Sequence, residues 1–147
     1  ITAGYQGTLG FGYPTSLGVK AANPDRAVVS VAGDGGFMFG VQELATAAQH
    51  GLGVVSLVFN NSAYGNIRRD QRTRFQGRMI ASELENPDFV ALAESFGVHG
   101  ERVASPEALR PALAAAIERN VPALIEITIE PDSEANPWQL FAMQKRK

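Results

Sequence analysis

Two short apolar runs, each followed at once by a polar or glycine-rich motif, constrain the fold of this chain most strongly. Residues 27–32 (AVVSVA) precede the motif GDGG, and residues 54–59 (VVSLVF) precede Asn60-Asn61. Continuous β-branched runs bounded by turn residues are typical of strands that are buried on both faces. A third such run lies at residues 123–129. The three runs predict a sheet whose strands are shielded from water.

The segments between these runs favour helices. Ser105 is a suitable N-cap, Pro106 and Glu107 suit the first turn, and Asn120 suits the end of the same helix. Strands that alternate with helices indicate an α/β fold: a doubly wound, mostly parallel sheet with helices on both faces. We expect helices at residues 14–22, 39–50, 89–96 and 106–119, and a further short strand at 99–103.

Composition excludes several classes of function. The 147 residues carry 15 acidic and 13 basic side chains, so the net charge of −2 gives no reason to expect nucleic acid or an anionic membrane as a partner. The absence of cysteine excludes disulfides, thiolate metal sites and a cysteine nucleophile, and it fits a cytoplasmic protein. No apolar run approaches the roughly 18 residues of a membrane span. Because residue 1 is Ile, we expect one domain of a longer chain.

The first motif combines features of a phosphate site and a cation site. Gly33, Gly35 and Gly36 allow a tight turn and close approach of backbone to a ligand, and a helix N-terminus attracts phosphate. Asp34 would repel a bare phosphate, but a divalent cation such as Mg²⁺ can bridge a carboxylate and a phosphate. The alternative for GDGG taken alone is an ordinary turn.

The second motif supplies another possible oxygen ligand, at a sequence separation that suits a crossover between parallel strands. Asn61 follows Asp34 by 27 residues, which is enough for a crossover that returns the chain to a neighbouring strand. The two side chains could then share one ion, with the backbone carbonyl of Ala63 as a third ligand. The alternative for Asn-Asn taken alone is a simple loop. The residues themselves therefore predict Mg²⁺ and a diphosphate without specifying which diphosphate.

The segment from GDGG to Asn61, GDGGFMFGVQELATAAQHGLGVVSLVFNN, closely resembles the thiamine-diphosphate fingerprint. With GYQGTLGFGYPTSLG before it, nearly the whole chain is similar to the C-terminal domain of the acetolactate synthase and 2-oxo acid decarboxylase superfamily. The resemblance implies that residues 1–147 form the diphosphate-binding domain of a thiamine-diphosphate enzyme. It also implies a separate pyrimidine-binding domain, with the activating glutamate, that is not part of this chain.

The resemblance assigns roles to individual residues. Asp34 and Asn61 match the side-chain ligands of Mg²⁺, and Ala63 matches the backbone ligand. Leu9 matches the bulky residue that wedges the cofactor into its bent shape, and the carbonyl of Gly7 matches the acceptor for the aminopyrimidine. The positions around the diphosphate are matched by Gly33, Asp34, Gly35, Gly36, Asn61, Tyr64 and Gly65.

The implied activity is decarboxylation or carboligation of a 2-oxo acid by a homodimer or homotetramer, with the isolated domain inactive. The substrate stays open, because residues 66–70 (NIRRD) stand where acetolactate synthases carry a Met-Val pair and then Trp. Two alternatives also stay open. One is a non-catalytic cofactor-binding or assembly module; the other is a dinucleotide-binding domain, for which Gly7, Gly10 and Gly12 give GxxGxG instead of GxGxxG.

Residues 62–82 have no clear period of apolar residues, and we expect a long loop with one helical turn. Five arginines lie between positions 68 and 78. They could bind an anionic group of a substrate, or they could belong to a solvated loop that orders against other domains.

Overall fold

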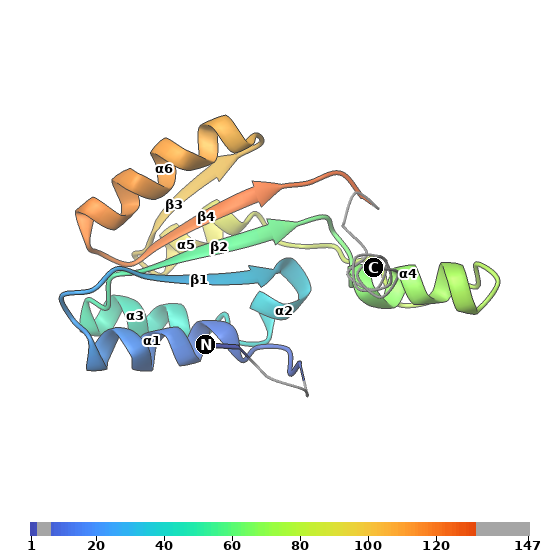
Figure 1. Ribbon diagram of the computed structural model, residues 1–147, viewed down its shortest axis with the longest axis horizontal. Helices are drawn as coiled ribbons and strands as arrows, with labels where there is room; N and C mark the ends of the chain where they lie inside the picture. The colour runs from blue at the N-terminus through green and yellow to red at the C-terminus, as the bar shows by residue number, and fades with distance from the viewer. Residues whose placement is uncertain (3–6, 132–147) are drawn as a thin grey trace, which may run out of the picture.

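A four-stranded parallel sheet forms the centre of the computed structural model, which describes residues 1–2 and 7–131. The strands lie in the order β1 (Val28–Gly33), β2 (Val54–Asn60), β4 (Ala123–Thr128) and β3 (His99–Val103), and all three pairings are parallel (Figure 1). The predicted α/β class and parallel sheet are confirmed.

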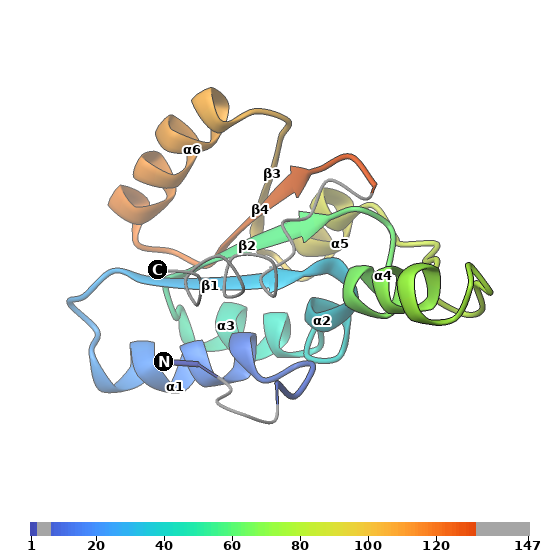
Figure 2. The same cartoon turned by 45° about the vertical axis from the view of Figure 1, so that its right-hand side comes forward.

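Helices cover both faces of the sheet, as expected for a doubly wound fold. One face packs against α1 (Gly12–Ala22), α2 (Asp34–Met38), α3 (Glu43–His50) and α5 (Phe89–Ser95). The opposite face packs against α6 (Pro106–Arg119), as Figure 2 shows. The expectation that all three predicted strands are shielded from water is wrong for β1: α6 lies over β2, β3 and β4, so Val31 of β1 is 63% exposed on this face.

Three aromatic rings anchor the short helix α2 beneath the sheet edge. Phe37 packs edge-to-face on Tyr13 and on Phe89, with ring centroids 5.4 and 6.0 Å apart. Burial, and secondarily the charge of Glu43, raises the pKa of the Tyr13 hydroxyl. The aromatic cluster therefore holds α2, which begins at Asp34, against two neighbouring helices.

Local signals at the ends of the predicted helices are confirmed. Ser105 caps α6 by accepting a hydrogen bond from the backbone N–H of Ala108 at 3.2 Å. Asn120 ends that helix in the left-handed conformation, with φ 49°, and Gly51 ends α3 in the same way, with φ 59°.

The helix predicted over residues 39–50 is confirmed from Glu43 to His50 as α3, but its predicted start is wrong because residues 39–42 form turns, and the separate helix α2 was not predicted. α2 begins directly after β1, and a turn at Gly40 separates it from α3. A Cβ at position 40 would lie 3.1 Å from the ring of Pro14 and 3.3 Å from the carbonyl oxygen of Gly10. This close approach of the start of α1 sets the break, and it has no signal in the local pattern. α1 itself begins at Gly12, two residues before the predicted start.

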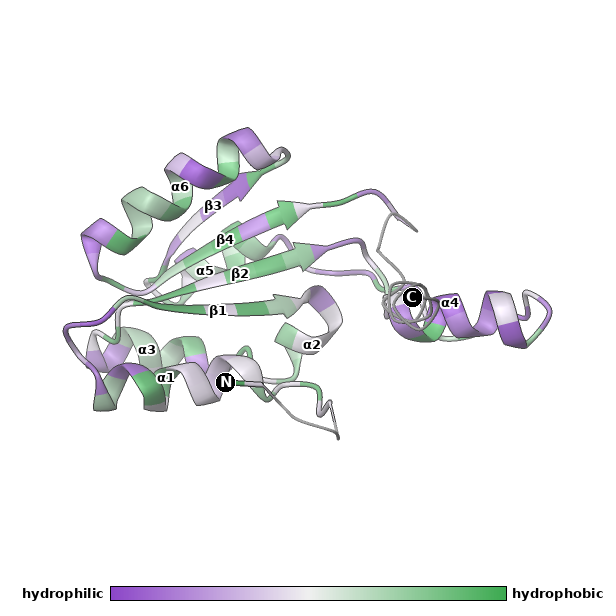
Figure 3. Ribbon diagram, viewed as in Figure 1, coloured by the Kyte–Doolittle hydropathy of each residue, from purple (hydrophilic) through white to green (hydrophobic). Residues whose placement is uncertain are grey.

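The expectation of a loop at residues 62–82 is also wrong. Ten of these residues form α4 (Gly65–Arg74), which projects from the end of the sheet and is polar along its length (Figures 1 and 3). None of its residues is buried, so it lacks the apolar stripe by which helices are predicted. The side chains of Asp70 and Arg74, one turn apart and 3.8 Å from each other, support it locally.

Within the described ranges, no helix has the length and apolar character needed to cross a membrane.

Candidate cofactor site

The two predicted motifs lie at the carboxyl ends of neighbouring strands. Gly33, the last residue of β1, is paired in register with Phe59 of β2. Asp34 follows the first strand, and Asn61 follows the second. Because β1 and β2 are parallel, both motifs emerge at the same edge of the sheet, as the sequence predicts.

The side-chain oxygens of Asp34 and Asn61 converge on one backbone group. The N–H of Ala63 donates to Oδ2 of Asp34 at 3.3 Å and to Oδ1 of Asn61 at 3.1 Å. Both side chains are buried, at 2% and 8% exposure respectively. A carboxylate oxygen and an amide oxygen therefore lie side by side, which is the arrangement that a shared hard cation needs.

The returning chain holds the loop that carries Asn61 and Ala63. The N–H of Tyr64 donates to the carbonyl of Ser82 at 2.9 Å, and the N–H of Leu84 donates to the carbonyl of Ser62 at 2.8 Å. Ser62 adopts the left-handed conformation, with φ 55°. These antiparallel contacts make the loop after β2 a fixed element of the site.

The side chains of Tyr64 and Leu9 pack against two glycines of α2. A Cβ at Gly35 would lie 2.5 Å from the ring of Tyr64, so this ring rests directly on the helix backbone. A Cβ at Gly36 would lie 3.6 Å from Cδ2 of Leu9, which is an ordinary contact. The structure therefore brings Tyr64 and Leu9 against the same five-residue helix.

Two cavities border this region. The smaller, of about 200 Å³, is lined by Gly33, Asp34, Asn61, Ala63 and Gly65 together with Phe59, Asn66 and Ile129. It contains the converging oxygens, and it is the place where the chain offers ligands for a cation.

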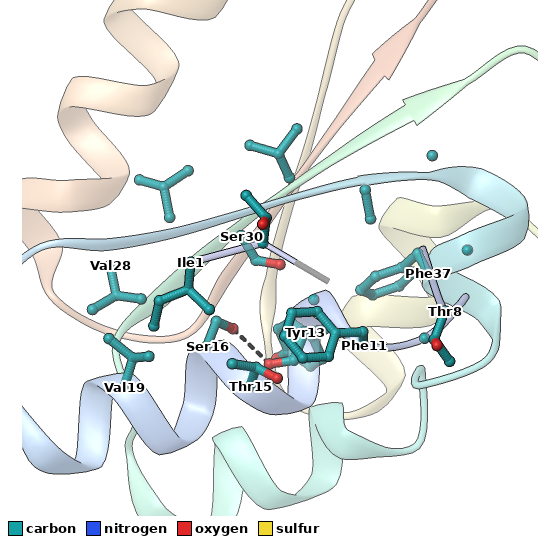
Figure 4. Close-up of a pocket in the computed structure, with 18 of the residues that line it drawn as sticks. Ile1, Thr8, Phe11, Tyr13, Thr15, Ser16, Val19, Val28, Ser30 and Phe37 are labelled. Atoms are coloured by element: carbon teal, nitrogen blue, oxygen red, sulfur yellow. Dashed lines mark hydrogen bonds between the residues drawn. The ribbon is translucent and has the colours of Figure 1, made fainter. Parts of the chain in front are cut away.

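The larger cavity, of about 700 Å³, extends along β1 and α1 and the residues that precede α1 (Figure 4). Gly7, Leu9 and Gly36 line it, and Gly33 lines both cavities. Gly7 is left-handed, with φ +56°, and Leu9 is 49% exposed. The predicted residues thus fall into two adjoining groups, the oxygen ligands and the N-terminal pair.

One residue of the site, Asn86, is not predicted by the sequence. Nδ2 of Asn86 donates to Oδ2 of Asp34 at 2.7 Å, across 52 positions of sequence. Asn86 precedes the Asp88 that caps α5, and an Asn-Pro before a helix signals only a helix start. No local pattern could have paired it with Asp34.

Comparison with known proteins decides between the diphosphates that such a site could hold. Residues 1–127 match the family model described as the thiamine pyrophosphate enzyme, C-terminal TPP binding domain. The chain belongs to this family. Thiamine pyrophosphate is thiamine diphosphate, so the predicted family and cofactor are confirmed. The match favours a thiamine pyrophosphate-binding domain over the dinucleotide-binding alternative.

Relatives of this thiamine pyrophosphate-binding domain include acetolactate synthases. The chain is 41% identical over 138 residues to a probable acetolactate synthase large subunit of Methanocaldococcus jannaschii, covering 93% of this chain and 23% of that protein. It is 36% identical over 141 residues to the acetolactate synthase isozyme 2 large subunit of Escherichia coli, covering 95% of this chain and 25% of that protein.

A solved structure shares the fold. It is the thiamine diphosphate-dependent 4-hydroxybenzoylformate decarboxylase of Rhodococcus jostii RHA1, with a TM-score of 0.81 and 36% identity. The match covers 88% of this chain and 24% of that one. This domain therefore spans about a quarter of the length of the relatives that it matches.

The residues present fit the metal end of the family's cofactor. In the part of the chain that the structure describes, no group of three or more His, Asp or Glu side chains could hold a metal ion. Asp34 is instead joined by the neutral Asn61. One carboxylate and one neutral amide leave one of the two positive charges of a divalent cation to be balanced, and a diphosphate can balance it.

Proposed function

We propose that the chain binds the Mg²⁺-diphosphate end of thiamine diphosphate. Asp34 and Asn61 bind the cation through their side chains, and Ala63 binds it through its backbone carbonyl. The observation that carries this proposal is the convergence of Asp34 Oδ2 and Asn61 Oδ1 on the N–H of Ala63, at 3.3 and 3.1 Å.

Backbone groups around the smaller cavity receive the diphosphate in this proposal. Gly33, Gly35 and Gly36 let the backbone approach it from one side, and Tyr64 and Gly65 lie on the other. Support comes from the start of α4, whose first residues Gly65 and Asn66 border the cavity. The N-cap Tyr64 makes no side-chain cap bond, so N–H groups of the first turn are suited to phosphate oxygens.

Leu9 and Gly7 act on the organic part of the cofactor. Leu9 supports its bent shape from beneath, and the carbonyl of Gly7 accepts a hydrogen bond from the aminopyrimidine. When bound, thiamine diphosphate supplies the carbon nucleophile for attack on a 2-oxo acid, while the protein supplies position and electrostatics. The exposure of the Leu9 side chain, 49%, supports a role that depends on shape and not on the core.

The complete enzyme, in this proposal, decarboxylates 2-oxo acids, ligates them to an acceptor, or does both. It is a cytoplasmic homodimer or homotetramer, and a pyrimidine-binding domain of the same or a second subunit completes each cofactor site. Supporting observations are the acetolactate synthase and decarboxylase relatives and the quarter of their length that this chain spans. The isolated domain is therefore inactive.

Calorimetric titration of the intact protein with thiamine diphosphate, with and without Mg²⁺, tests the cation site. The comparison is among the wild type, Asp34→Ala, and the matched control Asp25→Ala, which removes an exposed carboxylate from the turn before β1. We expect Mg²⁺-dependent binding in the wild type and the control, and its loss in Asp34→Ala.

Two results would contradict the proposal. One is absence of binding to the folded wild-type protein, and the other is Mg²⁺-dependent binding that survives unchanged in Asp34→Ala. Metal-independent competition by NAD or FAD would instead favour the dinucleotide alternative. Binding without turnover of any 2-oxo acid by the intact protein would favour a non-catalytic module.

A further inference from the structure

The carboxylate of Asp34 is held through one of its two oxygens. Oδ2 accepts hydrogen bonds from Nδ2 of Asn86 at 2.7 Å and from the N–H of Ala63 at 3.3 Å. Among the described residues, these are the two hydrogen bonds that the Asp34 carboxylate accepts. The orientation of the carboxylate therefore depends on Asn86, whose bond is the shorter, and neither bond uses Oδ1.

A series of side-chain hydrogen bonds determines that Asn86 presents its NH₂ group, and not its oxygen, to Asp34. Nδ2 of Asn86 also donates to Oδ1 of Asn60 at 3.0 Å, and Nδ2 of Asn60 donates to Oε1 of Glu126 at 2.7 Å. A carboxylate only accepts, so Glu126 forces Asn60 to turn its NH₂ group toward it and its oxygen toward Asn86. The N–H of Ser62 donates to the same oxygen at 3.0 Å. Asn86 must then present its NH₂ group, and both of its N–H bonds are used.

The far end of this series is anchored by charge. Glu126 is 3% exposed, and its Oε2 accepts from Nε of Arg102 at 2.7 Å on the neighbouring strand β3. The bond to Glu126, and then the bond to Asp88, raises the pKa of the Arg102 guanidinium. Asp88 caps α5 and lies 2.9 Å from Arg102. The hydrogen-bonded side chains thus connect the start of α5 to the candidate cofactor site.

We propose that Asn86 is a positioning residue for the metal ligand Asp34, with its own orientation set by Glu126 through Asn60. This inference rests on the proposed function. Removal of the amide leaves the Asp34 carboxylate with only the longer bond, from the N–H of Ala63, and therefore less firmly oriented. Loss of a group that orients a metal ligand typically weakens metal affinity by about 10–100-fold.

The test measures the affinity of the intact protein for Mn²⁺ at saturating thiamine diphosphate, by the paramagnetic resonance of free Mn²⁺. Asn86→Ala removes the donor, and Asn86→Leu removes it while filling similar space, in case the smaller side chain impairs folding. Asn23→Ala is the matched control, because the side chain of Asn23 makes one local bond among the described residues, from Nδ2 to the carbonyl of Val19 at 3.0 Å. Asp34→Ala tests the cation site itself.

We expect a dissociation constant for Mn²⁺ that is raised about 10–100-fold in both Asn86 variants and unchanged in Asn23→Ala. Excess Mn²⁺ should restore cofactor binding in the Asn86 variants, which a folding defect would not allow. A folded Asn86→Ala or Asn86→Leu with wild-type affinity, alongside an Asp34→Ala that has lost the metal, would overturn this inference alone. Unchanged Mn²⁺ binding by Asp34→Ala would overturn the proposed function as well.

Discussion

The contact between the Tyr64 ring and the backbone of α2 can be tested by replacing Gly35 with Ala. The new Cβ would lie 2.5 and 2.6 Å from two ring carbons of Tyr64 and 3.1 Å from Cδ1 of Leu84. To reach the 3.6 Å separation that a Cβ at Gly36 would have from Leu9, the ring must move by about 1 Å. Gly35→Ala therefore forces the site to rearrange.

Gly36→Ala is the matched control for this substitution. Both glycines lie in α2, so the gain in helix propensity, about 1 kcal/mol, is common to both variants and cancels in their comparison. Overpacking of this kind costs about 1–3 kcal/mol. We expect Gly35→Ala to be less stable than Gly36→Ala by that amount. For a domain of this size, the difference corresponds to a lowering of Tm by about 2–12 °C.

Scanning calorimetry of the cofactor-free intact protein measures this difference in the transition that contains the domain. Using the cofactor-free state keeps any change in ligand affinity out of the comparison. Equal transition temperatures for the two variants, or a higher one for Gly35→Ala, would refute the argument that the Tyr64 ring is seated on Gly35.

Two further substitutions test the helix starts. Hydrogen bonds from the backbone N–H of Ala91, and then from Arg102, lower the pKa of the Asp88 carboxyl in the folded state. The stability that ionised Asp88 contributes is therefore fully present above its unfolded-state pKa of about 3.9, and it is lost as the pH falls through the lower folded-state pKa. Asp88→Asn should therefore show a shallower loss of unfolding free energy below about pH 4 than the wild type, and parallel curves would contradict this expectation. Ser105→Ala removes the acceptor for the N–H of Ala108 and should cost about 1 kcal/mol in chemical denaturation, whereas Ser105→Asn should retain most of the stability.

Local signals predicted the elements that depend on local physics. The three β-branched runs form β1, β2 and β4, and the helix cap at Ser105 and the helix ends at Gly51 and Asn120 lie where the sequence indicates. The exposed helix α4 was missed because no apolar stripe marks it, and its only support is polar. The break at Gly40 was missed because its cause is Pro14, far away in the sequence.

The sequence by itself determined which chemical groups meet at the candidate site. Asp34 and Asn61 follow two of the predicted strands, and parallel pairing of such strands brings their carboxyl ends to one edge, so the proximity of these two candidate ligands could be predicted from position alone. The spacing of the two motifs, with the residues between them, also predicted the family.

Only the tertiary structure decided how these ligands are held. Asn86 reaches Asp34 because the chain returns from α4 along the sheet edge, and the direction of its amide is dictated by Glu126 on another strand. Hydrogen bonds between side chains depend on distances of about 3 Å and on which atom donates. Neither follows from periodicity or propensity, because both are set by segments that meet only when the sheet is assembled.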